Sequence, residues 1–396
     1  MTVLSAQPEP NVRRRRGSVI EEIPVSISIS SAEDVRRALA LRDLTDPAQG
    51  PHAMQQIVEA CASRLSNIWS SATRVHRASP IVSVADNYDR LRYPVEGVAR
   101  DARYTRYVSA ATVLRTQTSA MIPPLLCELA QGDTADILLV CPGLVYRRDC
   151  IDRLHTGEPH QLDLWRIRRA DHLTSADLEI MIDAVVTAAL PGRAWRTSAA
   201  AHPYTVAGLQ IDVRDGSSWV EIGECGLAHP EILAASGLSG STGLAMGLGL
   251  DRVLMLRKGI DDIRLLRSTD SRVARQMIDL LPYRPVSSMP PVRRDLSIVV
   301  SADTTPEELG DRVRAALGDR ADAIESVEVL AETPYASLST AARTRLRLEP
   351  EQKNVLVRVV LRDLARTLTH AEANELRDAI YGALHQGQAM EWASPR

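Results

Sequence analysis

The sequence predicts an α+β protein with two folded domains behind an N-terminal tail. The chain has 396 residues, which is more than one ordinary domain needs. Its hydrophobic content of 45% and charged content of 24% are typical of a globular protein. A Pro-rich stretch at residues 281–291 separates two halves whose patterns differ. We therefore expect a flexible tail over residues 1–45, one domain over 46–280 and a second over 284–390.

The tail carries a run of four arginines, Arg13 to Arg16, after polar and Pro-containing residues. Such a run favours a solvated arm. Contact with RNA phosphates is a second interpretation. An organelle-targeting peptide is a third, although the acidic pair Glu21 and Glu22 follows closely.

The first domain opens on helical spacing at residues 52–65, where Met54, Ile57, Val58, Cys61 and Leu65 fall on one face. Residues 109–129 predict a strand, a turn and a helix. The apolar run 137–146 predicts a buried strand.

Residues 174–189 predict an amphipathic helix with Thr174 or Ser175 as its N-cap. The stretches 208–213 and 219–222 alternate as strands do. We expect a further helix over 244–258, after a Gly/Ser-rich loop at 236–243.

The second domain follows the order β-α-β-β-α. Strands are predicted at 296–300, 324–330 and 354–361, and helices at 306–317 and 369–384. This order predicts a small split βαβ sandwich of ferredoxin type, βαββα with room for a last strand.

Charge and cysteine usage limit the class of protein. The net charge is −3, so any nucleic-acid contact needs a local basic patch. Five scattered cysteines without CxxC spacing argue against a structural zinc or a disulfide framework. They favour a reducing compartment, and we expect a cytoplasmic location. No apolar run reaches the roughly 18 residues that a membrane span needs.

Phenylalanine is absent from the whole chain, whereas there are 9 Tyr and 5 Trp. A chain of this length and ordinary composition carries roughly a dozen or more Phe residues. Because Tyr and Trp are present, aromatic residues in general are not avoided.

Two runs carry residues suited to phosphate chemistry. In residues 145–161 (VYRRDCIDRLHTGEPHQ), Arg147 and His155 follow the buried strand, and Gln161 and Asp163 lie on the returning strand. Arginine suits charge that develops on phosphate oxygens, whereas an acid with an amide suits a substrate ammonium. A surface hairpin with incidental charges is the alternative.

The second run, residues 240–252 (GSTGLAMGLGLDR), places glycines where a helix packs closely and ends on Arg252. It has neither the end of a P-loop nor the spacing of a dinucleotide fingerprint.

Together these runs resemble motifs of class II aminoacyl-tRNA synthetases, specifically the phenylalanyl-tRNA synthetase catalytic chain. The resemblance covers roughly residues 46–385, and the second domain is similar to the family's anticodon-binding domain. Further matching runs are NYD at 87–89, LRTQTSA at 114–120, HPYT at 202–205, WVEIGECGLAHP at 219–230, IRLL at 263–266 and PVRRDLSIVV from 291.

The resemblance implies a class II antiparallel-sheet core with flanking helices and a ferredoxin-like domain, in a single chain like the organellar enzyme. It implies a phenylalanine–tRNA ligase that uses ATP and Mg²⁺, with an aromatic amino acid and tRNA-Phe as partners. No membrane partner is implied. The protein would be a monomer or a homodimer.

The resemblance also implies residue roles. The catalytic residues would be Arg147, holding the ATP α-phosphate and the substrate carboxylate, and Arg252, holding the γ-phosphate. His155 would contact phosphates, and Glu221 would lie at the ATP or magnesium side. Ser119, Gln161 and Asp163 would fix the amino-acid head group, with Asp163 in place of the family's Glu. The side-chain pocket would be formed by His202, Tyr204, Ala245 and Met246, with the small Ala245 leaving room at its floor.

Departures from the family share one pattern, the loss of Phe. The family's FPF is His202-Pro203-Tyr204, its AFG is Ala245-Met246-Gly247, and its adenine-stacking Phe is Pro159. Similarly, NFD is Asn87-Tyr88-Asp89, and Gln117 stands where His is usual.

Several functional hypotheses follow from these departures. A Phe-free ligase would suit a backup or self-resistance enzyme, whose synthesis does not depend on its own product. Polar atoms of His202 and Tyr204 suit an altered aromatic specificity that serves biosynthesis. The lost ring at Pro159 suits a non-catalytic regulator that binds tRNA.

Overall fold

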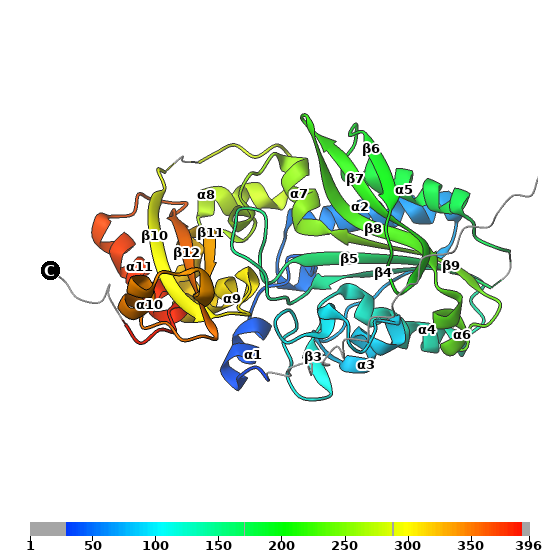
Figure 1. The fold of residues 1–396 in the computed structure, drawn as a ribbon. Coiled ribbons are helices and arrows are strands. Elements are labelled where there is room, and N and C mark those ends of the chain that lie inside the picture. The colour runs from blue at the N-terminus through cyan, green and yellow to red at the C-terminus, as the bar shows by residue number, and fades with distance from the viewer. Residues whose placement is uncertain (1–28, 170, 287–288, 390–396) are drawn as a thin grey trace, which may run out of the picture.

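The computed structural model describes residues 29–169, 171–286 and 289–389, which form two lobes (Figure 1). The larger lobe is built on a seven-stranded sheet in the order β1-β4-β5-β9-β8-β7-β6. All neighbours are antiparallel except β1 and β4. The predicted α+β class is confirmed. The strands are β1 Ala72–Val75, β4 Asp136–Leu144, β5 His160–Arg168, β6 Trp195–Ala199, β7 Thr205–Asp215, β8 Ser218–Ala228 and β9 Thr242–Gly249.

Three helices cover one face of this sheet, namely α2 (Ala53–Trp69), α5 (Ser175–Ala189) and α7 (Leu250–Lys258). The predicted apolar stripe of α2 is buried in the main core. His52 caps this helix rather than beginning it. Thr174 caps α5 through a capping box with Asp177, as its sequence predicts.

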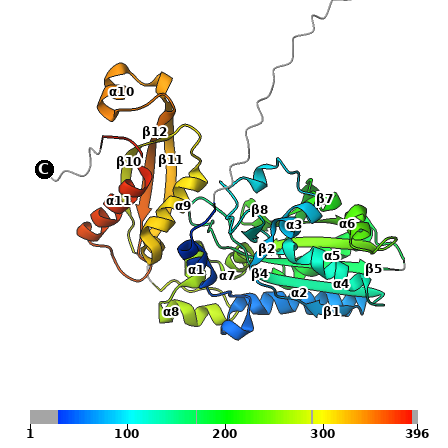
Figure 2. The ribbon, with the colours of Figure 1, turned by 90° about the horizontal axis from the view of Figure 1, so that it is seen from below.

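The other face carries shorter elements, which Figure 2 shows from below. They include the 3-10 helix η4 (Thr118–Met121), α4 (Ile122–Ala130) and α6 (Pro230–Ala235), which share a second core with the sheet. A small hairpin of β2 (Ile81–Ser83) and β3 (Thr112–Leu114) lies nearby with α3 (Val84–Asn87).

The helix predicted over residues 244–258 is wrong in its first part. Residues up to Gly249 form β9, which is hydrogen-bonded to β5 on one side and β8 on the other. Leu244, Met246 and Leu248 are buried on one face and alternate with small residues. This period of two belongs to a strand, and the helix begins only at Leu250.

The predicted flexible tail is wrong for residues 29–45. Helix α1 spans Ala32–Leu39 and is capped by Ser31. Leu44 packs in the main core, and Thr45 is fully buried. The segment therefore belongs to the folded larger lobe, and burial of Ala38 and Leu44 offsets part of the entropy cost of ordering it. Residues 1–28, with the run Arg13 to Arg16, lie outside the described residues.

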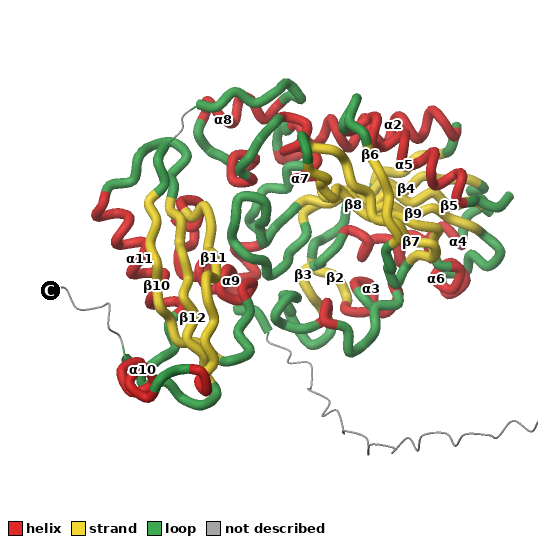
Figure 3. The backbone as a smooth tube through the Cα atoms, turned by 45° about the horizontal axis from the view of Figure 1, so that its top comes forward, coloured by secondary structure: helices red, strands yellow, loops and turns green. Residues whose placement is uncertain are grey.

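The smaller lobe has a three-stranded antiparallel sheet in the order β10-β12-β11 (Figure 3). Its strands are β10 Val292–Ser301, β11 Ile324–Pro334 and β12 Gln352–Leu361. Helices α9 (Pro306–Leu317) and α11 (His370–Leu384) close a separate core. The order β-α-β-β-α is as predicted, with the short α10 (Thr340–Leu346) added before the third strand. Within residues 289–389 this sheet has no fourth strand.

The two lobes meet where α1, α9 and the loop after β4 come together (Figures 1 and 2). Arg314 of α9 donates to the carbonyl oxygens of Asp149 (2.6 Å) and Cys150 (2.8 Å). The amide of Val327 donates to the carbonyl of Ile151 (2.7 Å). A cavity of about 1030 Å³ lies at this junction.

The remaining elements are short. None of the helices in the described ranges combines the length and apolar character needed to cross a membrane. The short helices are α8 Ser271–Ala274, η1 Pro47–Gln49, η2 Asp89–Leu91, η3 Val98–Arg100, η5 Ile263–Arg267, η6 Arg275–Ile278, η7 Gly318–Ala323 and η8 Tyr335–Ser337.

Candidate active site

A pocket of about 600 Å³ opens over the middle of the large sheet. Its floor comes from β5, β8 and β9, and its walls from η4 and from the loop that joins β4 to β5. The predicted site residues Arg147, His155, Glu221 and Arg252 all line it, as do Ser119, Gln161, Asp163 and Tyr204. The structure therefore brings eight residues together from five separate stretches of sequence.

Three cationic side chains line the pocket, namely Arg147, His155 and Arg252. Arg147 is positioned by its Nε, which donates to the carbonyl of Thr116 (2.7 Å). Arg252, in the first turn of α7, donates to the carbonyl of Glu221 (3.1 Å). His155 lies 2.7 Å from the Asp152 carboxylate, which raises the pKa of the imidazole to about 10. This histidine is therefore protonated at neutral pH, and the three cations suit a polyphosphate.

A carboxylate lies beside these cations. Burial, followed by the neighbouring Glu224, raises the pKa of Glu221, whereas Arg252 lowers it. Oxygen donors of this kind suit Mg²⁺. Within the described ranges, the group of three possible metal ligands does not include Glu221. It consists of Cys150, Asp152 and His155, whose ligand atoms lie within 4.8 Å of one another. A thiol and an imidazole are not the ligands that Mg²⁺ selects.

The pocket also holds a buried acid, Asp163. Asp163 is only 1% exposed. It accepts hydrogen bonds from Thr118 Oγ1 (2.9 Å), Ser119 Oγ (2.9 Å) and Trp165 Nε1 (3.4 Å). Burial raises the pKa of this carboxyl to about 6. Ser119 and Asp163 are thus adjacent, as predicted, but the acid already has protein partners.

Gln161 lies near Ser119 and Asp163. Its Oε1 accepts the amide N–H of Thr118 (3.3 Å), and the side chain lines the pocket. It lies two residues before Asp163 on β5, so both side chains point to the same face of the sheet.

The pocket floor is a row of cross-strand neighbours. Asp163 of β5 pairs with Gly247 of β9, which pairs with Glu224 of β8. Along β9 the pocket face carries only the small residues Gly249, Gly247 and Ala245. The floor is therefore bare backbone, with a carboxylate on either side.

A β-bulge places two carboxylates of β8 on this face. Residues three apart in a regular strand point to opposite faces. The register between β7 and β8 shifts at Ile222, whose side chain is buried in the main core. Glu221 and Glu224 therefore both line the pocket.

The predicted side-chain pocket contains rings of the protein itself. Tyr204 is stacked on Trp165 (6.1 Å between ring centroids), on Tyr93 (6.5 Å) and on His202 (6.0 Å). His202 does not line the pocket directly, and its Nε2 lies 2.9 Å from a Glu224 oxygen.

Two assignments to this pocket need correction. Ala245 is fully buried opposite Trp165, so the room that a small residue would leave is filled by the indole. Met246 points to the other face of β9, into the core against α2, α5 and α7. Neither residue lines the pocket.

Sequence reasoning missed four residues of the site: Tyr93, Thr118, Trp165 and Glu224. Trp165 follows Asp163 by two on a strand, so strand periodicity was a usable signal. Glu224 gave no such signal, because its orientation depends on the bulge. Tyr93 donates to Gln117 Oε1 (2.8 Å), a contact that only the fold creates.

The family model of the tRNA synthetases class II core domain (F) matches residues 43–277. The chain therefore belongs to the class II tRNA synthetases, and it is an aminoacyl-tRNA ligase.

Within this class, the motif resemblance to phenylalanyl-tRNA synthetases is confirmed by relatives of that name. The probable mitochondrial phenylalanine–tRNA ligase of Drosophila melanogaster is 29% identical over 388 residues, covering 81% of each chain. The chloroplastic/mitochondrial enzyme of Arabidopsis thaliana is 27% identical, covering 80% of this chain and 72% of its own length.

Two other similarities are to a ligase alpha subunit and to a solved structure of another synthetase. The phenylalanine–tRNA ligase alpha subunit of Limosilactobacillus reuteri is 29% identical over 70% of this chain and 85% of its own length. A solved pyrrolysyl-tRNA synthetase of Desulfitobacterium hafniense aligns with a TM-score of 0.42 at 17% identity, over 59% of this chain and 76% of that one.

Proposed function

We propose that this chain is a phenylalanine–tRNA ligase, which activates an aromatic amino acid with ATP and transfers it to tRNA-Phe. The observation that carries the proposal is the set of groups that share the pocket. Arg147, His155 and Arg252 line it together with Ser119, Gln161 and Asp163. The names of the relatives from Drosophila and Arabidopsis support the same activity.

In the first reaction a carboxylate oxygen of the amino acid attacks the α-phosphorus of ATP. The bond from this phosphorus to the bridging oxygen breaks, and pyrophosphate leaves. Arg147 would stabilise charge on the α-phosphate, and Arg252 and His155 charge on the departing pyrophosphate. Mg²⁺, held at Glu221, would neutralise phosphate charge when bound.

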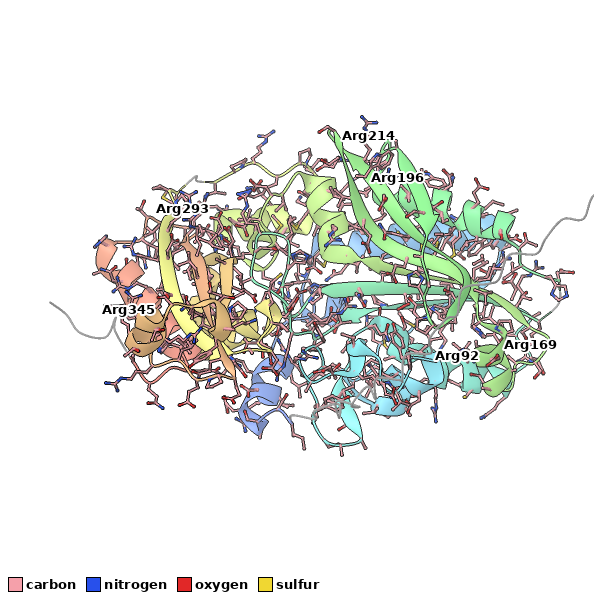
Figure 4. The ribbon with its side chains drawn as sticks, in the orientation of Figure 1. Arg92, Arg169, Arg196, Arg214, Arg293 and Arg345 are labelled. Atoms are coloured by element: carbon pink, nitrogen blue, oxygen red, sulfur yellow. The ribbon has the colours of Figure 1, made fainter. Side chains whose placement is uncertain are left out.

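The smaller lobe is proposed to bind the anticodon. Exposed arginines lie on both lobes, for example Arg293 on β10 and Arg345 on α10, or Arg196 and Arg214 on the outer strands (Figure 4). These arginines would bind tRNA phosphates locally, although the net charge of the whole chain is −3. We keep residues 46–280 and 284–390 as the proposed domains, with 29–45 joined to the first. The proposed state is a monomer or homodimer in the cytoplasm, whereas two relatives carry organellar names.

ATP–pyrophosphate exchange with an amino-acid panel tests this function. We expect exchange in the wild-type protein and a loss of about 10²- to 10³-fold in kcat/KM for Arg147→Ala. Filter binding of tRNA should be unchanged in this variant. Arg74→Ala, which removes an arginine paired with Glu128 outside the pocket, is the matched control. Unaltered exchange in Arg147→Ala contradicts the site assignment.

A second candidate is altered aromatic specificity, which would serve a biosynthetic pathway. It is favoured by Trp165 and Tyr204, which pack in the apolar space that the small Ala245 would otherwise leave open. A preference for a substituted ring over Phe in the exchange assay would establish it.

The non-catalytic alternative rests on Pro159, which lines the pocket where a stacking ring is expected. It predicts tRNA binding without exchange for any amino acid. The proposed backup or self-resistance role rests on the absence of Phe from the chain. Deletion of the gene should then impair growth under Phe starvation or on a toxic Phe analogue.

A further inference from the structure

We infer that Glu224, anchored by His202, recognises a hydrogen-bond donor on the side chain of the amino acid, such as a ring hydroxyl or a ring amino group. The inference rests on the proposed function of the pocket in amino-acid activation. It makes Glu224 a specificity-determining residue that sequence motifs did not indicate.

The first argument is position. Asp163 and Glu224 face each other across Gly247, in one row of the sheet. Adjacent strands lie about 4.8 Å apart, so the backbones that carry the two acids are about 10 Å apart. Gly247 has no side chain between them. A ligand on this floor therefore meets an acid at each end.

The second argument is accessibility. Asp163 is enclosed and accepts from Thr118, Ser119 and Trp165. The Glu224 side chain is 42% exposed and lines the pocket. Within the described ranges His202 is its one polar partner, at a single oxygen. Of the two acids that pair across Gly247, Glu224 is thus the one open to a ligand.

The third argument is anchoring. The His202 side chain is 9% exposed, stacks on Tyr204 and contacts Glu224 Oε2 at 2.9 Å. The backbone packs closely here: Ala207 has a φ of +52°, and a Cβ on Gly208 would lie 2.4 Å from the Ala200 carbonyl oxygen and 3.1 Å from His202 Nδ1. A strained bulge at such a place fixes a side chain that the site uses.

The fourth argument is what surrounds Glu224. Glu224 contacts His202, and His202 stacks on Tyr204, so the carboxylate lies beside the aromatic rings. The apolar recess above Ala245 is filled by Trp165. An unsubstituted phenyl ring would therefore cover the Glu224 carboxylate without supplying a donor, and a site of this kind discriminates against such a substrate.

The test is ATP–pyrophosphate exchange by the full-length protein with Phe, the three ring isomers of tyrosine, and 3- and 4-aminophenylalanine. We expect at least one donor-bearing acid to exceed Phe by about 10- to 100-fold in kcat/KM. Comparison of the tyrosine isomers with the aminophenylalanines identifies whether a hydroxyl or an amino group is the donor. Glu224→Gln should lower kcat/KM for that acid by about 10-fold and for Phe by less than about three-fold.

Two further variants sharpen the result. His202→Ala frees the carboxylate and should lower the preference in the same direction. Glu128→Gln, at an exposed position of α4 where Glu128 pairs with Arg74, is the matched control and should leave the preference unchanged. The wild-type ranking needs no variant, so it decides the question even where a variant does not fold.

A wild-type preference for Phe over every donor-bearing acid overturns the inference and leaves the proposed function standing. An equal loss for Phe and the donor-bearing acid in Glu224→Gln also overturns it, because this is the result of a purely structural role. If no amino acid supports exchange, the proposed function fails instead. Titration calorimetry with the same acids then decides whether donor-bearing side chains bind more tightly than Phe.

Discussion

At the residue scale, the most unusual group is the buried acid of the pocket. Asp163 has three protein donors, yet burial raises its pKa from 3.8 to about 6. The folded state therefore holds a proton on Asp163 more tightly than the unfolded chain does. Between these two pKa values the folded state binds more protons, so this group's contribution to stability falls as pH rises and is gone above about pH 7.

Asp163→Asn removes this titration while keeping the shape of the side chain. Between pH 5 and pH 7.5 the Asp163 contribution to the unfolding free energy of the wild type should fall by roughly 1 kcal/mol. The variant should lack that decrease, so the difference between the two proteins changes with pH. Urea unfolding of both proteins at each pH measures it. A constant difference across this range shows that the pKa of Asp163 is not raised.

Individual site residues were predictable where the chain marks them locally. Arg147, His155 and Gln161 lie in one short run, and the structure brings them to one pocket. The resemblance assigned both Ala245 and Met246 to the pocket, but neighbours on a strand face opposite sides, so Met246 lies in the main core. The filling of the recess by Trp165 depends on its cross-strand partner, which no local pattern indicates.

At the scale of elements, the bulge in β8 decides how the pocket is lined. Gly223 lies beside it, and a Cβ at this position would be 2.1 Å from the carbonyl oxygen of Gly247. No side chain can adjust to relieve that contact, because the obstacle is backbone. The close approach of β8 and β9 therefore requires glycine here.

Gly223→Ala should destabilise the protein by about 2 kcal/mol or more and lower amino-acid activation, because β8 must shift. Gly382→Ala in α11 is the matched control, since nothing lies within 4 Å of the added methyl group. It should stabilise the protein by roughly 0.5–1 kcal/mol through helix propensity. Thermal unfolding of the two variants compares them, and equal shifts would contradict the required close approach.

Elements with strong local signals were predicted well. The stripe of α2, the N-cap of α5 and the β-α-β-β-α order of the smaller lobe follow from periodicity and caps. The strand β9 was not predicted, because its Gly and Ala residues have no side chains that reveal a period of two. Its identity is fixed by hydrogen bonds to β5 and β8, which are distant in sequence.

At the scale of the whole molecule, the loop between β4 and β5 is held by both lobes. Arg147 belongs to the pocket of the larger lobe, whereas the carbonyls of Asp149 and Cys150 accept from Arg314 of the smaller lobe. Gly310 of α9 lies against the same backbone, where a Cβ would approach the Asp149 carbonyl oxygen to 2.6 Å. The lobe junction thus supports the loop that carries the phosphate-binding residues.

Arg314→Ala should loosen this loop, because two buried carbonyl groups lose their charged donor. We expect a cost of roughly 2–4 kcal/mol in the docking of the lobes. Tryptic cleavage at Arg148 and Arg153 should become several-fold faster. Ala316→Ser, at an exposed position of the same helix, is the control. Equal cleavage rates in Arg314→Ala and the wild type would show that the junction does not hold the loop.

The junction also explains why the tail was predicted wrongly. Residues 29–45 carry mixed polar and apolar residues without a strong period over much of their length. Leu44 is ordered by contacts with the main core, and α1 by its place beside α9 and the loop. Such contacts join parts of the chain that are far apart in sequence, and so they are invisible to local patterns.

The bare floor along Gly247 and Gly249 has a consequence for how such an enzyme changes in evolution. Main-chain atoms cannot be exchanged by mutation, so the surface beneath the substrate is inherited almost unaltered. Changes in substrate specificity must therefore come from the strands beside β9, at Trp165 of β5 and at Glu224 of β8. The arginines that handle phosphate lie at neither of these positions. New substrates can therefore be acquired by one or two substitutions, while the machinery for activation is carried forward intact.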